Sequence, residues 1–153
     1  MNLMLETLWA FLATVAFSIM FNTPKKELLY CGMSGAIGWF FYSLCIKIGF
    51  SSTFSNFWGT IFIAYFSRLF AIIRRNPISV FLISGIITLV PGAGIYNTVL
   101  HIIMSDNKMA SFYGIETIKI ACAIAFGIIV ILSLPQFMFK FNFKIKPKSN
   151  NTI

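Results

Sequence analysis

Charged side chains are scarce in this sequence. Only 4 of its 153 residues are acidic, and Asp, Glu, Lys and Arg together make up 10% of the chain. Average soluble chains carry about 25% charged residues, so a water-soluble globular domain is excluded. The sequence is instead 58% hydrophobic and 17% aromatic. This composition predicts an integral membrane protein, and the length suits one small membrane domain.

Residues that carry catalytic or metal chemistry are also few. Cys31, Cys45 and Cys122 show no C-x-x-C spacing, and the single histidine, His101, has no second ligand near it in the sequence. The phosphate-binding pattern Gly-x-x-x-x-Gly-Lys-Ser/Thr is absent. We therefore expect no catalytic residue, no metal site, no cofactor and no enzymatic activity.

Basic residues outnumber acidic ones, 12 to 4, and the net charge is +8. In a soluble chain such an excess would suggest nucleic acid as the partner. Here the lysines and arginines lie at the ends of apolar runs, so anionic lipid headgroups are the expected partners and nucleic acid is not.

Five apolar runs are candidates for membrane spans, because a bilayer core of about 30 Å requires roughly 20 helical residues. They cover residues 3–21, 28–48, 57–73, 78–104 and 117–139. Polar connections are expected at residues 49–56 and 105–116, and Pro135 should bend or end the last span. The predicted fold is an all-α integral membrane protein with about five transmembrane helices in residues 1–139, followed by a basic tail in residues 140–153.

The fourth run is interrupted near its middle by Pro91-Gly92-Ala93-Gly94-Ile95-Tyr96. Proline removes a backbone donor, and glycine allows conformations closed to other residues. Inside a membrane, such irregular backbone is tolerated only where it lines a cavity or is packed in protein. A half-helix beginning here would present free N–H groups to an anion. The alternative interpretation is a proline kink with glycine for close packing, and a re-entrant second half would change the number of spans.

Side chains around this break are candidate transport residues. Gly92 and Gly94 would permit close approach of a substrate, Tyr96 and Asn97 could add hydrogen bonds, and Thr88 lies on the preceding half. Arg68 lies six residues before Arg74, about 9 Å deeper along its helix. Its side chain either extends to the headgroups or faces the interior as a counter-charge for an anionic substrate.

Two further patterns bear on packing and coupling. In the second run, Gly32 and Ala36 form a small-x-x-x-small pair, with Gly35 and Gly38 on adjoining faces, and this predicts close helix contact within the chain or in a homo-oligomer. The acids near a span that could couple transport to protons are Glu6, Asp106 and Glu116, all expected near the outer surface.

The distribution of basic residues predicts an orientation. One side holds Lys25, Lys26, Arg74, Arg75 and the tail lysines Lys140, Lys144, Lys146 and Lys148, eight of the 12 basic residues, and the other holds Lys47, Lys108 and Lys119. The positive-inside rule then places the N-terminus outside and the tail in the cytoplasm of a multi-pass protein of the cell membrane.

Several of these segments resemble the small, membrane-only subunit of the threonine/serine exporter family. The resemblance covers about residues 15–135, and its most specific part is Pro91-Gly92-Ala93-Gly94-Ile95-Tyr96 within the block 80–96. The other matching segments are Phe21-Asn22-x-Pro24, Gly35-Ala36-Ile37-Gly38, Gly59-Thr60-Ile61 and Arg75-x-Pro77. The sequence departs from the family where some relatives carry His and, three residues later, Arg. Those positions are Trp39 and Tyr42 here.

The resemblance implies one subunit of a bipartite secondary exporter of small carboxylate metabolites, either threonine and serine or a dicarboxylate such as succinate. It also implies a larger membrane subunit with a soluble N-terminal domain as the partner. The alternative function is a non-transporting membrane scaffold that assembles or localises a larger membrane protein through its glycine-rich face.

Overall fold

The computed structural model describes residues 2–135, and this part of the chain is all-helical, without a strand. Its elements in order are α1 (Leu3–Met20), η1 (Lys25–Glu27), α2 (Leu28–Ile48), α3 (Ser52–Arg74), α4 (Ile78–Ile86), η2 (Ile87–Leu89), α5 (Gly92–Ile103) and α6 (Asn107–Ser133). Four segments are long and apolar enough to cross a membrane: α1, the continuous segment formed by η1 and α2, α3, and α6. The bent pair formed by α4–η2 and α5 adds a fifth if it counts as one span. The predicted all-helical membrane fold is confirmed.

Local sequence explains where several helices end. Gly49 adopts a φ of 103°, a left-handed conformation that favours glycine, and its N–H donates to the Ile46 carbonyl to close α2. The residue before a proline is biased away from the helical conformation. Accordingly, Leu134 is extended before Pro135, and α6 ends at Ser133. The expectation that Pro135 ends the last span is therefore confirmed, whereas residues 136–139 of that span and the tail lysines lie outside the described residues.

Both predicted polar connections were too long. Helix α3 begins at Ser52, where a polar stretch was expected up to residue 56, and α6 begins at Asn107 rather than at residue 117. The polar residues of the two expected connections are accommodated at the starts of the helices through two kinds of hydrogen bond. Ser51 and Asp106 cap the first turns by accepting hydrogen bonds from the N–H groups of Phe54 and Met109. Within α3, the Ser55 hydroxyl donates to the carbonyl of Ser51, four residues earlier.

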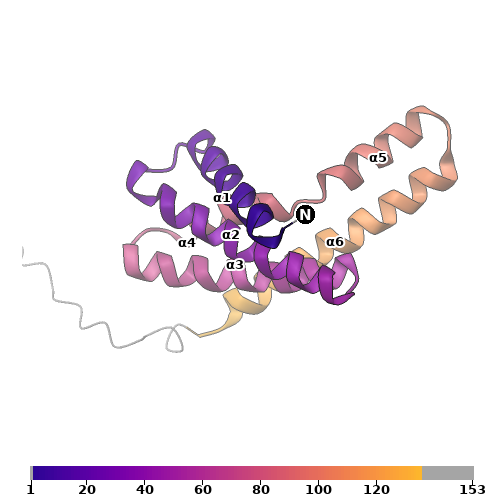
Figure 1. The fold of residues 1–153 in the computed structure, drawn as a ribbon. Coiled ribbons are helices and arrows are strands. Elements are labelled where there is room, and N and C mark those ends of the chain that lie inside the picture. The colour runs from indigo at the N-terminus through magenta and orange to yellow at the C-terminus, as the bar shows by residue number, and fades with distance from the viewer. Residues whose placement is uncertain (1, 136–153) are drawn as a thin grey trace, which may run out of the picture.

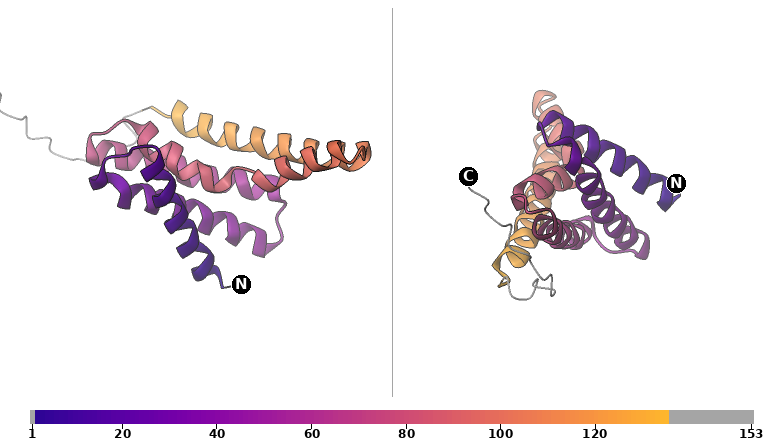
Figure 2. Two further views of the ribbon diagram at one scale, coloured as in Figure 1. Left: turned by 90° about the horizontal axis from the view of Figure 1, so that it is seen from above. Right: turned by 90° about the vertical axis from the view of Figure 1, so that its left-hand side faces the viewer.

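Helices α1 to α4 form a bundle from which a two-helix arm extends (Figures 1 and 2). Helices α2 and α3 pack against each other, α4 packs on both, α1 packs on α2, and α6 packs on α3. Helix α5 packs mainly on α6 and has no buried residue. We call α5 and residues 107–117 of α6 the arm.

The bundle core combines aliphatic side chains with small polar ones. One apolar cluster contains Ile63, Ala64, Leu82, Leu89, Ile124 and Ile131. Buried hydroxyls are satisfied without water, as Thr14 and Thr60 show by donating to carbonyls four residues earlier. Between helices, the hydroxyls of Ser34 in α2 and Ser67 in α3 are 3.0 Å apart. This arrangement suits a membrane interior, where every unsatisfied polar group is costly.

Glycines of α2 lie where helices approach closely. A methyl group added at Gly32 would lie 2.6 Å from a ring carbon of Phe11, and one added at Gly35 would overlap the side chain of Thr14, both on α1. Gly38 faces Ile63 on α3 in the same way. Ala36, the fourth small residue of this segment, is half-buried.

Replacing Gly38 by alanine is expected to destabilise the bundle. The new methyl group would overlap the side chain of Ile63, which is 0% exposed and has no free space in which to move. Overpacking of this kind costs about 1–3 kcal/mol. Thermal unfolding in detergent would measure the loss. The control is Gly114→Ala, whose methyl group would lie 3.4 Å from its nearest neighbour, a carbon of Thr98, and equal stability of the two variants would contradict the prediction.

Glu27, which directly precedes α2, is buried at 5% exposure and pairs with Arg74. The Arg74 guanidinium donates Nε and Nη2 to both carboxylate oxygens at 2.8–3.1 Å, and it lies over the ring of Tyr30. A bidentate pair of this geometry is directional, so it joins the start of α2 to the end of α3.

Candidate functional site

The chain bends sharply at the predicted break. Helix α4 continues through η2 to Leu89, Val90 is extended, and α5 begins at Gly92 at an angle of 52° to the preceding segment. Pro91 cannot donate a backbone hydrogen bond, and the Gly92 N–H turns back to the Val90 carbonyl at 2.8 Å. The helix is therefore interrupted where the sequence predicted.

A cleft of about 310 Å³ opens at this bend, and we call it the break cleft. Its volume lies at the lower end of the range of small-molecule sites. It is bordered by the break and by three helices: Trp39 and Tyr42 of α2, Ser52 and Asn56 of α3, Thr88, Leu89, Val90, Pro91, Gly92, Ala93 and Gly94 of the break, and Tyr113, Glu116, Thr117 and Ile120 of α6.

Free backbone donors lie at the start of α5. Within residues 2–135, neither a side chain nor a carbonyl accepts from the N–H groups of Ala93 and Gly94. Nothing lies within 4 Å of a methyl group placed at Gly92, so the space beside this turn is open. Unpaired N–H groups at a helix N-terminus carry a partial positive charge. This edge of the cleft can therefore receive an anionic group such as a carboxylate.

The opposite wall carries complementary groups. The carboxylate of Glu116 is 41% exposed and receives a hydrogen bond of 3.1 Å from Lys119. The indole Nε1 of Trp39 is buried and has no hydrogen-bond partner in the described part of the chain. An unpaired buried donor costs about 1–3 kcal/mol, so a bound acceptor would relieve it. The cleft thus offers the free N–H groups of the break and one carboxylate.

The candidate residues named from the sequence fall into two groups. Thr88, Pro91, Gly92 and Gly94 line the break cleft. Tyr96, 66% exposed, and Asn97 do not line it.

Arg68 also lies elsewhere. It is on α3, about 18 Å along the axis from Asn56. Its Nη1 donates to the Ile131 carbonyl at 2.6 Å, in the last turn of α6, where a cation interacts favourably with the helix dipole.

Sequence reasoning did not identify several residues of the cleft as site residues. Asn56 and Thr117 lie at the edges of the predicted connections and spans, and Glu116, named from the sequence only as a possible proton-coupling acid, lies in the predicted connection 105–116. Trp39 and Tyr42 carried a signal, since they occupy the positions where some members of the resembled family have His and Arg.

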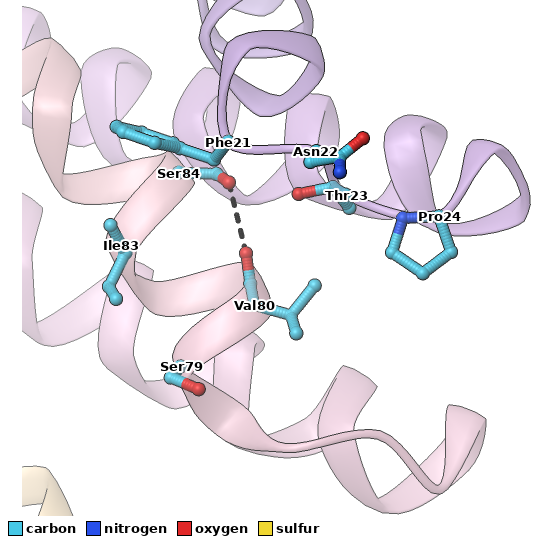
Figure 3. A pocket seen from close by; sticks show the side chains of 8 residues that line it. All are labelled: Phe21, Asn22, Thr23, Pro24, Ser79, Val80, Ile83 and Ser84. Atoms are coloured by element: carbon cyan, nitrogen blue, oxygen red, sulfur yellow. Dashed lines mark hydrogen bonds between the residues drawn. The ribbon is translucent and has the colours of Figure 1, made fainter.

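A second hollow, of about 270 Å³, lies at the other end of α4. Figure 3 shows Phe21, Asn22, Thr23 and Pro24 on one side of it and Ser79, Val80, Ile83 and Ser84 on the other. The Ser84 hydroxyl already donates to the Val80 carbonyl at 2.9 Å. No charged side chain lines this hollow, so the break cleft is better suited to a charged metabolite.

Comparison with known proteins supports a transport role for this fold. An uncharacterized protein of Haemophilus influenzae is 27% identical over 150 residues, which cover 91% of this chain and 48% of the relative. The chain thus spans about half the length of that protein. No solved structure matches. The family model described as threonine/serine exporter, ThrE, matches residues 6–134. Because that match covers most of the chain, this multi-pass membrane protein belongs to the threonine/serine exporter family.

Proposed function

We propose that this chain is the membrane subunit of a secondary exporter of small hydroxylated amino acids, with threonine and serine as the substrates. The substrate binds in the break cleft. The observation that carries the proposal is the placement of free N–H groups at the start of α5 and of the Glu116 carboxylate in one cleft.

An α-amino acid has the charges that these two groups complement. Its carboxylate accepts hydrogen bonds from the N–H groups of Ala93 and Gly94, and its ammonium group pairs with Glu116. Asn56, Tyr42 and Thr117 border the same space and supply partners for a side-chain hydroxyl. Transporters commonly bind the carboxylate of a substrate at the N-terminus of a discontinuous helix near the bilayer midplane. A dicarboxylate such as succinate suits this cleft less well, since its second carboxylate would meet Glu116.

A larger membrane subunit of the same family is the proposed partner, and the arm is the surface that docks on it. The matched relative is about twice as long as this chain, which leaves room for a second membrane half. Helix α5 has no buried residue, and Ile95, Val99 and Ile102 form an exposed apolar stripe along it. Backbone N–H groups are not left unpaired against lipid, which supports a partner surface that covers the cleft between the arm and the bundle.

The proposed orientation has the N-terminus outside and residues 140–153 in the cytoplasm. The Glu27–Arg74 pair brings Lys25, Lys26 and Arg75 to one end of the bundle, the end that the positive-inside rule assigns to the cytoplasm. The break cleft then lies toward the outer side of the bundle.

Replacing Glu116 by glutamine is the test of the substrate class. We expect export of threonine to fall by roughly tenfold or more, because a hydrogen bond to a charged group contributes about 1.5–3 kcal/mol. Uptake of labelled threonine into inverted membrane vesicles, and its inhibition by serine and by succinate, would measure this. Weaker inhibition by serine, together with unchanged or stronger inhibition by succinate, supports an ammonium site. If the variant transports threonine at the parental rate, Glu116 does not bind the substrate.

A further inference from the structure

A second carboxylate lies in the first turn of α1, partly enclosed between α1 and α2. Glu6 of α1 has a side chain that is only 14% exposed. The hydroxyl of Ser43 in α2 donates a hydrogen bond to its Oε2, and Nζ of Lys47, one turn further along α2, lies 4.0 Å from its Oε1. The sequence names Glu6 as one of three acids expected near the outer surface, and the structure packs its side chain against α2. An ionisable side chain within a membrane span is costly to keep, which points to a functional role.

Glu6 borders a cavity of about 260 Å³ whose other lining residues are Trp9, Ala10, Ala13, Trp39 and Thr88. Two of these, Trp39 and Thr88, also line the break cleft. Thr88 belongs to η2, the last turn before the helix breaks, and its hydroxyl donates to the Gly85 carbonyl while keeping lone pairs free. The cavity of Glu6 and the proposed substrate site therefore share two side chains, one of which lies at the hinge between α4 and α5.

The charged surroundings of Glu6 are simple. Helix α1 packs on α2, α4 and η2. From α2, Lys47 is the charged side chain that faces the carboxylate, while α4 and η2 carry no titratable side chain. A metal cation would require several oxygen ligands. Among the described residues, this cavity and its rim provide the Glu6 carboxylate and the hydroxyls of Ser43 and Thr88, too few for a metal cation but enough for a proton.

We propose that Glu6 is the proton-coupling group of the exporter, an inference that rests on the proposed transport function. The carboxylate takes up a proton from the outer side and becomes a neutral carboxyl group, and it releases the same proton to the cytoplasmic side in the opposite state of the cycle. Uptake weakens its attraction to Lys47 and converts one acceptor oxygen into an O–H donor. Thr88 offers an acceptor for that donor in the shared cavity, so the protonation state biases the position of η2 and, through it, of the N–H groups that bind the substrate.

The test is Glu6→Gln, which keeps the size and the acceptor oxygen of the side chain but cannot exchange a proton. Inverted membrane vesicles are prepared from the native host, in which the gene is deleted and restored as the parental or the variant form. We expect threonine uptake driven by an imposed pH gradient to fall to the rate measured without a gradient. We expect exchange of external labelled threonine for internal unlabelled threonine to continue, because exchange requires no net proton movement.

Two matched variants separate coupling from structure. Lys47→Gln breaks the ion pair but keeps the carboxyl group, and gradient-driven uptake should persist. Asp106→Asn removes an acidic charge at the tip of the arm, where an amide can still cap α6, and both activities should persist. If Glu6→Gln is absent from the membrane, Ser43→Ala replaces it. Losing the hydroxyl that orients the carboxylate should lower gradient-driven uptake while exchange continues.

Each outcome decides between explanations. Parental vesicles that show no more uptake or exchange than the deletion strain would refute the transport function, and this inference with it. Normal parental activity with driven uptake intact in Glu6→Gln would overturn the role of Glu6 alone. Loss of both activities in Glu6→Gln, or loss of driven uptake in Lys47→Gln, would show that the ion pair has a structural role instead. Gradient-driven uptake at the parental rate in Ser43→Ala would also overturn the proposal.

Discussion

Gly92→Val is expected to abolish export while leaving the amount and the stability of the protein unchanged. A side chain at this position meets no atom within 4 Å, so it enters open space beside the free N–H groups and not the packed interior. It blocks the approach of a carboxylate to these groups, and losing a hydrogen bond to a charged group costs about 1.5–3 kcal/mol, or roughly ten- to more than a hundredfold in affinity. Threonine uptake into inverted vesicles and thermal unfolding in detergent would measure the two properties.

The neighbouring positions supply the controls for this experiment. Gly92→Ala should have a smaller effect than valine because its side chain fills less of the opening. Gly94 is a poor choice, since a methyl group there would overlap the hydroxyl of Thr117 and disturb the packing of the arm even without a substrate. Tyr96→Phe should export at the parental rate, because the ring is 66% exposed and does not line the cleft. Parental export by Gly92→Val would show that the break is a packing kink, and the scaffold function would then gain support.

The purified chain alone is expected to show no threonine flux in liposomes. The break cleft has unpaired backbone N–H groups beside α5, which packs mainly on α6, and in the proposal the partner covers this side of the transport path. Flux should appear when the chain is reconstituted together with the membrane protein that co-purifies with it from the native host.

Two controls belong with this reconstitution. Gly92→Val reconstituted with the same partner should remain inactive, which excludes flux through the partner by itself. The oligomeric state of the lone chain should also be measured, since the arm could dock on a second copy. Robust threonine flux from this chain without another polypeptide, as a homo-oligomer, would remove the partner from the proposal.

Helix boundaries show where sequence reasoning lost accuracy. Apolar runs located α1 and α2 within about a residue, since hydrophobic length alone defines such spans. Helices α3 and α6 began 5 and 10 residues earlier than predicted, at Ser52 and Asn107 rather than at residues 57 and 117. N-capping by Ser51 and Asp106 lets α3 and α6 begin within polar sequence. A search for apolar runs does not detect such capping residues.

The sequence by itself determined the class, the family and the position of the break. These depend on local properties: low charge, long apolar runs, and a proline, which cannot continue the helix before it. Only the tertiary structure decided which side chains gather at that break. The cleft joins Trp39 to Glu116 across 77 positions of the chain, and the burial of Glu6 depends on Ser43 and Lys47 of another helix. Such neighbours are set by how helices pack, and no local pattern in the chain encodes them.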